Sequence, residues 1–166
     1  MRKVIALCAG LIVLALANYT IHIRERLLTE GRVALLQIAP VDPRSLMQGD
    51  YMALRFQAAN DAFGTGNARK DGLDGHIVLK LDERAIGTFT RFDDGSALNG
   101  NEVRMRYRIR DGRPKFATNA FFFQEGDAMK YTAARYGEFR IDPDGEAILT
   151  GLRDKDTLPL GEALRK

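Results

Sequence analysis

Residues 39–56 hold the densest group of side chains that could perform chemistry. Four polar residues surround two prolines and a glycine there, namely Asp42, Arg44, Asp50 and Tyr51. Arg44 could pair with one carboxylate and form a polar binding site beside a turn. A structural role competes with this interpretation, because turn aspartates commonly accept backbone hydrogen bonds and no histidine lies nearby in the sequence to act with them. The structural role is the favoured interpretation, and binding is the alternative.

Four arginines alternate with apolar residues in the segment from Glu102 to Arg110. They are Arg104, Arg106, Arg108 and Arg110. In a strand this alternation places them on one face, with successive arginines about 7 Å apart. Such a stripe could bind an anionic partner, and phospholipid head groups are the most available anion for a domain tethered to a membrane. The favoured interpretation is instead a solvated face that protects a sheet edge and pairs with acidic neighbours such as Glu102, Asp93 and Asp94.

Enzymatic chemistry has one candidate nucleophile, Ser45. It precedes a Gly-Asp pair and a predicted strand, an order similar to that of Ser-Lys proteases of the signal-peptidase kind. The spacing is short, the following proline is missing, and Lys70 and Lys80 are only nominal bases. A cell-envelope hydrolase is therefore the alternative function. Two histidines and one cysteine leave little for a zinc or redox-metal site, and neither a metal nor a cofactor is predicted.

An apolar segment near the N-terminus predicts a membrane anchor. The run from Val4 to Ala17 is extended to Ile23, which supplies about the 20 residues that a spanning helix needs. A cleavable signal peptide ending at Ala15-Leu16-Ala17 competes with this interpretation. Because Ile21 continues the apolar face beyond that site, residues 1–23 are expected to be an uncleaved anchor.

The short N-terminal tail is expected to remain in the cytoplasm. This orientation places the rest of the chain on the periplasmic, extracytoplasmic side of the bacterial plasma (inner) membrane, which the protein crosses once. Residues 24–31 consist of helix formers followed by a glycine. They are predicted to be a short helical linker that extends the anchor and ends at Gly31.

Residues 32–153 show the alternation and the turn sequences of a β-rich domain. Strands are expected at residues 33–38, 51–56, 77–82, 85–92, 102–110, 115–123, 138–141 and 146–152. A mobile loop is expected at residues 57–75 and a polar tail at residues 154–166. A helix of about two turns is expected to begin after Asp127, which would cap it. The predicted fold class is mainly β, a single antiparallel β-sandwich or small barrel with one or two short helices.

The charge balance argues against nucleic-acid binding. The chain has 25 basic and 22 acidic residues, and Arg2 and Lys3 precede the apolar segment. The remainder therefore has an excess of a single basic residue, whereas nucleic-acid-binding domains usually have a larger or more concentrated excess. The lone cysteine, Cys8, excludes an intramolecular disulfide.

The segment Gly49-Asp50-Tyr51, followed by Leu54, resembles the signature of the GDYXXLXY family, bacterial membrane-anchored proteins without an established activity. Phe56 stands where the family signature has tyrosine. The resemblance extends from Arg24 to Leu160 and implies the same anchored domain, but it supplies no catalytic residues. Family members are often encoded beside a polytopic membrane protein, which implies such a partner.

The function expected from these observations is that of a membrane-anchored, extracytoplasmic binding or accessory module that acts with a membrane-protein partner. Its candidate interaction residues are Asp42, Arg44, Gly49, Asp50, Tyr51 and Leu54, with the four arginines as a second, anion-facing set. The sequence makes no prediction about the oligomeric state.

Overall fold

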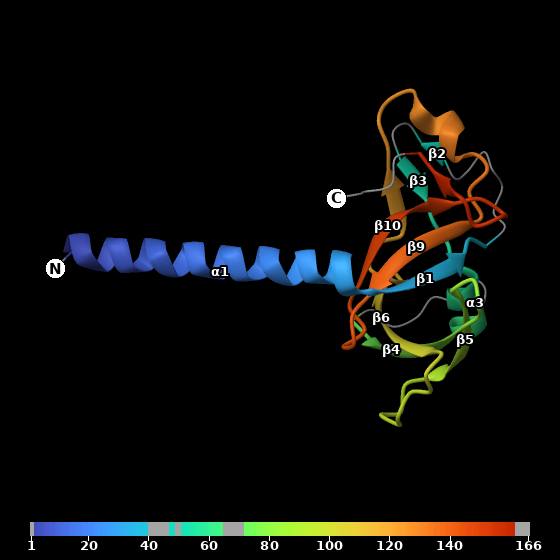
Figure 1. Cartoon of the computed structure of the whole chain (residues 1–166), viewed down its shortest axis with the longest axis horizontal. Helices are drawn as coiled ribbons and strands as arrows, with labels where there is room; N and C mark the ends of the chain where they lie inside the picture. The colour runs from blue at the N-terminus through green and yellow to red at the C-terminus, as the bar shows by residue number, and fades with distance from the viewer. Residues whose placement is uncertain (1, 40–46, 49–50, 65–71, 162–166) are drawn as a thin grey trace.

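The computed structural model describes residues 2–39, 47–48, 51–64 and 72–161. A long N-terminal helix, α1 (Arg2–Glu30), projects from a β-rich domain (Figure 1). Strand β1 (Arg32–Gln37) begins directly after Gly31. The Gly31 N–H donates a hydrogen bond to the Leu27 carbonyl oxygen at 3.1 Å, which closes the last turn of α1. The helix and the sheet are therefore joined without a linker.

The domain contains ten further strands and two short helices among the described residues. The strands are β2 (Met47–Gln48), β3 (Tyr51–Ala53), β4 (Asp74–Leu81), β5 (Ile86–Phe92), β6 (Glu102–Arg110), β7 (Arg113–Lys115), β8 (Ala120–Phe122), β9 (Tyr136–Ile141), β10 (Ala147–Arg153) and β11 (Pro159–Leu160). The helices are α3 (Gln57–Phe63) and the 3₁₀-helix η1 (Asp127–Tyr131).

Eight strands form one sheet in the order β11-β10-β9-β1-β5-β4-β6-β7, and β2, β3 and β8 form a smaller sheet. All strand pairs are antiparallel except β1 with β5. The large sheet curves, since the Arg106 N–H in β6 donates to the Gly145 carbonyl in the turn between β9 and β10 at 2.8 Å. The predicted mainly β fold is confirmed.

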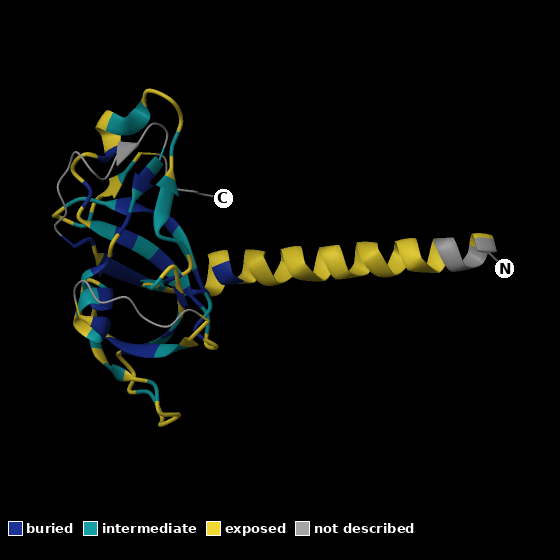
Figure 2. Ribbon diagram, turned by 180° about the vertical axis from the view of Figure 1, so that it is seen from behind, coloured by how far each residue is buried: buried dark blue, intermediate teal, exposed yellow. Residues whose placement is uncertain are grey.

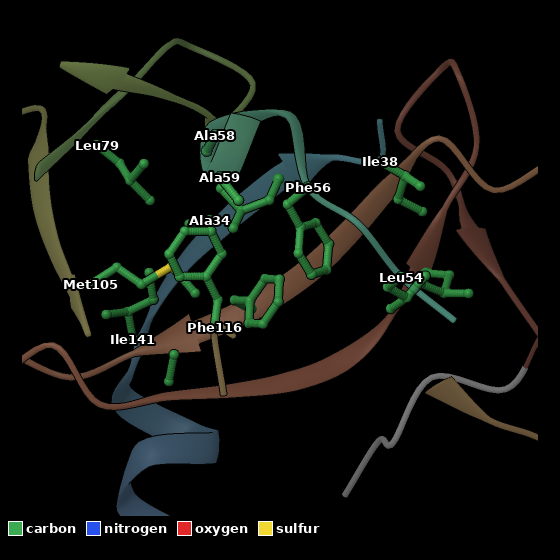
Figure 3. Packing of buried hydrophobic residues seen from close by; sticks show 14 of the residues in the cluster. Ala34, Ile38, Leu54, Phe56, Ala58, Ala59, Leu79, Met105, Phe116 and Ile141 are labelled. Atoms are coloured by element: carbon green, nitrogen blue, oxygen red, sulfur yellow. The ribbon is translucent and has the colours of Figure 1, made fainter. Parts of the chain in front are cut away.

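A cluster of buried apolar side chains, mostly aliphatic and with aromatic rings among them, fills the concave side of this sheet (Figure 3). The Phe56 ring lies edge-on to Phe139, with ring centroids 5.2 Å apart, and 6.4 Å from Phe116. Gly137 makes room for this packing, because a Cβ there would lie 2.8 Å from the Phe56 ring. Leu54 and Phe56 are both buried, as predicted. The strand expected at residues 51–56 is too long, however, because β3 ends at Ala53 and Phe56 forms only an isolated bridge with Ile38.

α1 lies outside this core along almost its whole length (Figure 2). Of its residues whose burial the structure describes, Leu27 alone is buried. The helix from Leu7 to Glu30 is long and apolar enough to cross a membrane. The predicted N-terminal apolar helix is therefore confirmed, and α1 is a candidate membrane span.

The predicted loop at residues 57–75 is wrong in its first part, where α3 forms. This short helix buries Ala58 and Ala59 against the core. Its last residue, Phe63, lies edge-on to Tyr107, with ring centroids 4.8 Å apart. Tertiary burial of one apolar face therefore stabilises a helix that is too short to form alone.

Three other local predictions need correction. The strand expected at residues 115–123 is two strands in different sheets, β7 and β8, separated by a bend in which Ala117 has a φ of 51°. Asp127 begins η1 but does not cap it; Gly126, in the left-handed region, occupies that position without a side-chain hydrogen bond. Within the expected tail, β11 pairs with the edge of β10.

Candidate functional site: an arginine cluster on β6

Strand β6 places its apolar residues and its arginines on opposite faces. Val103, Met105 and Ile109 are buried, while the arginines point away from the core. The predicted one-sided stripe is present, but its predicted position on a sheet edge is wrong. β6 lies between β4 and β7 and forms backbone hydrogen bonds with both.

Arg106, Arg108 and Arg110 surround two carboxylates from other parts of the sheet. Asp74, the first residue of β4, lies 2.9 Å from Arg110 Nη1 and 3.3 Å from Arg106 Nη2. Glu146, in the turn before β10, forms a direct ion pair with Arg106. Their pairing requires the fold, because Asp74 and Glu146 are distant from β6 in the sequence.

Arg108 is the least engaged of the three guanidinium groups. Its closest approaches are 3.6 Å to Glu146 and 3.9 Å to Asp74, longer than an ordinary hydrogen bond. Its side chain is 45 % exposed, against 36 % for Arg106. Arg108 therefore keeps N–H donors available for a ligand.

Arg104 stands apart from this cluster. It forms an ion pair with Asp93, with Nη2 3.4 Å from Oδ1, as the sequence predicted. The other two predicted acidic partners are wrong, because Asp94 and Glu102 pair with Arg91 at 3.2 and 3.5 Å. Arg104 is thus largely neutralised and is not part of the site.

A cavity of about 430 Å³ lies over the cluster. Its charged lining consists of Asp74, Arg106, Arg108, Arg110, Lys115 and Glu146, and these residues are called the arginine site below. Four cations thus face two carboxylates. Lys115 also lies 2.9 Å from Asp111, outside the cavity. The site therefore has a net positive charge and more N–H donors than its own carboxylates can accept, which suits an anionic ligand.

The ionised state of the site is stabilised by its internal contacts. Hydrogen bonding from Arg110, together with its positive charge and that of Arg106, lowers the pKa of Asp74 below its ordinary value of 3.8. The Glu146 carboxylate raises the pKa of Arg106 by hydrogen bonding and by charge. The Arg106 guanidinium and the Asp74 carboxylate are therefore both charged in the neutral pH range, and their mutual contact holds Arg106 in place.

The arginine site lies on the side of the domain from which α1 leaves. Arg32, at the start of β1, pairs with Ile141 at the end of β9, so the turn that carries Glu146 lies beside the end of α1 (Figures 1 and 2). Arg32 also donates from Nη2 to the Gly100 carbonyl at 2.7 Å and from Nη1 to the Glu102 carbonyl at 3.1 Å. These bonds tie the base of α1 to the start of β6.

Most of the predicted motif residues cannot be placed in relation to this site. Asp42, Arg44, Gly49 and Asp50 lie outside the described residues, as does Ser45, the candidate nucleophile.

The other two motif residues lie away from the arginine site. Tyr51 begins β3 and its ring lies 5.8 Å from that of Phe122. Leu54 is 1 % exposed within the core, and its N–H donates to the Asn119 carbonyl at 2.7 Å. Leu54 is therefore a core residue rather than a contact residue.

Sequence reasoning missed the acidic half of the arginine site. Asp74 opens an alternating segment and Glu146 follows an Asp-Pro-Asp-Gly turn, so each sits where a strand begins. Only the pairing of β4 with β6 and the curvature of the sheet bring them together. Among the residues that the structure describes, no group of His, Cys, Asp and Glu side chains is arranged to hold a metal ion.

Comparison with known proteins gives one match. A family model described as GDYXXLXY protein matches residues 13–152, which is most of the chain. No curated protein and no solved structure matches. The match thus covers α1 from its middle onward and the domain up to the end of β10.

Proposed function

This chain belongs to the GDYXXLXY protein family, and we propose that it is a membrane-anchored binding module that presents an anion-binding site at the surface of a bacterial plasma membrane. In this proposal α1 is an uncleaved, single-pass anchor. The β domain lies on the periplasmic side and acts as an accessory subunit of a membrane-protein partner.

The observation that carries the proposal is the position of the arginine site relative to α1. The site has a net positive charge and lies on the α1 side of the domain. α1 continues into β1, which lies between β9 and β5 within the large sheet, so no linker allows the domain to turn away from the membrane. A rigid connection of this kind favours a site that acts on something at the membrane surface.

A membrane-protein partner is supported by the polar residues of α1. Asn18 and His22 lie one turn apart on the exposed helix, and neither side chain forms a hydrogen bond within the described part of the chain. Leu27, which touches the domain, is nine residues from Asn18 and so lies on the opposite face. Polar side chains within a membrane commonly form hydrogen bonds with a neighbouring helix. The Asn18 face is therefore free to contact a partner helix.

Affinity capture of the full-length chain from mildly solubilised membranes tests the proposal. The wild-type chain should retain a membrane protein that Asn18→Leu loses at equal expression. Thr20→Val is the matched control, because the Thr20 hydroxyl already donates to the Leu16 carbonyl of its own helix at 2.6 Å. Capture of no membrane protein by the wild-type chain, or equal capture by Asn18→Leu, would overturn the accessory role.

A further inference from the structure

We propose that the arginine site binds the phosphate group of an anionic phospholipid in the membrane that α1 spans. The inference rests on the proposed function and names the ligand of the same site. It commits to a lipid rather than to an anionic segment of a protein.

The part of α1 that follows the apolar span is long enough to place the domain at the level of the lipid head groups. If the apolar span ends at Ile23, the helix continues over residues 24–30 before β1 begins, which is roughly 10 Å at 1.5 Å per residue. Each head-group layer of a bilayer is about 5–7 Å thick, since the whole membrane measures about 40–45 Å around a core of about 30 Å. The α1 side of the domain therefore lies directly above the lipid phosphates.

The chemistry of the site fits a phosphate diester. A phosphate offers several acceptor oxygens, and guanidinium groups bind it through paired, charge-assisted hydrogen bonds. Arg108 has N–H donors that its long contacts to Glu146 and Asp74 leave available, and Lys115 adds a second cation to the cavity lining. Asp74 and Glu146 hold Arg106 and Arg110 in position without cancelling the positive charge of the site.

Tethering makes a lipid the favoured source of this phosphate. A head group in the same membrane is present at a high effective concentration, so even a modest intrinsic affinity gives high occupancy. The negative surface of the membrane also attracts basic side chains that lie within about 8 Å of it. A free anion in bulk solution has neither advantage.

Titration of the purified full-length chain in an uncharged detergent tests the inference. Short-chain phosphatidylglycerol, short-chain phosphatidylcholine and inorganic phosphate are the three probes, and native mass spectrometry counts the bound molecules. One phosphatidylglycerol should bind per chain, about tenfold more tightly than phosphatidylcholine, whose choline group offsets the phosphate charge.

Variants assign the binding to the site. Arg108→Gln should weaken phosphatidylglycerol binding about tenfold, and Arg108→Lys should weaken it less, because it keeps the charge but loses the paired donors. Arg84→Gln is the matched control, since Arg84 is exposed in the turn between β4 and β5, outside the site. An unchanged melting temperature of each variant shows that the fold is intact.

Three results would overturn the inference. The first is equal affinity for phosphatidylglycerol and phosphatidylcholine. The second is equal phosphatidylglycerol affinity of Arg108→Gln and Arg84→Gln. The third is an affinity for inorganic phosphate as high as that for phosphatidylglycerol. The last result leaves the anion site standing but makes its ligand a free phosphate. Loss of the captured membrane protein in Arg108→Gln, with lipid binding unchanged, would assign the site to that protein. Because capture is expected to depend on Asn18, failure of the lipid inference is distinguishable from failure of the accessory role.

Discussion

Arg106 and Glu146 form an ion pair between β6 and the turn that precedes β10, across 40 residues of sequence. The backbone reinforces this contact, because the Arg106 N–H donates to the Gly145 carbonyl at 2.8 Å. One residue thus joins the two parts of the curved sheet through both its main chain and its side chain. The contact also fixes one guanidinium group of the arginine site.

Removing the charge of Glu146 should strengthen anion binding. Glu146→Gln keeps the size of the side chain and raises the net charge of the site by one, so phosphatidylglycerol should bind more tightly. The melting temperature should change little, because both partners of the pair are about one-third exposed. Titration with phosphatidylglycerol measures the first effect. Weaker binding by a folded Glu146→Gln protein would contradict this prediction, because the glutamine carbonyl can still accept the hydrogen bond that positions Arg106.

The aromatic core should account for much of the stability of the domain. Phe116 is 0 % exposed, so Phe116→Ala should lower the free energy of unfolding by about 3–5 kcal/mol. Phe122, which is 73 % exposed, is the matched control, and Phe122→Ala should change it by less than about 0.5 kcal/mol. Denaturant unfolding of the two variants measures both values. Similar losses in the two would contradict the packing described here.

Acid should weaken the domain in part through Asp74. The pKa of this carboxyl is below its ordinary value of 3.8 because Arg110 and Arg106 donate to it and attract its charge. Its contribution to stability is therefore fully present above pH 3.8 and is lost as the pH falls through the lowered pKa. Thermal melts should show a smaller drop below pH 3.8 for Asp74→Asn than for the wild-type chain. Identical acid profiles would show that Asp74 has no such role.

The orientation of the chain can be tested with reporters. Alkaline phosphatase fused after Arg32 should be active, because that position follows the span and the proposal places it outside the cytoplasm. A reporter that functions only in the cytoplasm should be inactive at the same position. The opposite pair of results would place the arginine site against the inner leaflet instead.

The sequence predicted those parts of the fold that local patterns determine. The alternation from Val103 to Arg110 was sufficient to predict a strand with an arginine face, and Asp142-Pro143-Asp144-Gly145 was sufficient to predict the hairpin of β9 and β10. α3 was missed because glycine-rich sequence follows it and only contacts such as Phe63 with Tyr107 stabilise it. Likewise, nothing local distinguishes one long strand at residues 115–123 from β7 and β8 in separate sheets.

The candidate site was predicted only in part, for the same reason. The arginines lie close together in the sequence, so their shared face follows from a strand period of two residues. Asp74 and Glu146 reach them through strand pairing and sheet curvature, which no local pattern encodes. The cavity, the net charge and the position beside α1 all depend on these long-range contacts.

The distance of the arginine site from the bilayer surface tests the central claim most directly. Two variants in a Cys8→Ser background would each carry one fluorophore on the introduced thiol. Ala117→Cys labels the cavity lining, and Asp61→Cys labels α3, at the far side of the domain from α1. Each labelled full-length chain would be placed in lipid nanodiscs that contain an acceptor dye on their head groups. The account predicts strong energy transfer from position 117 and weak transfer from position 61. Equal transfer, or stronger transfer from position 61, would contradict it.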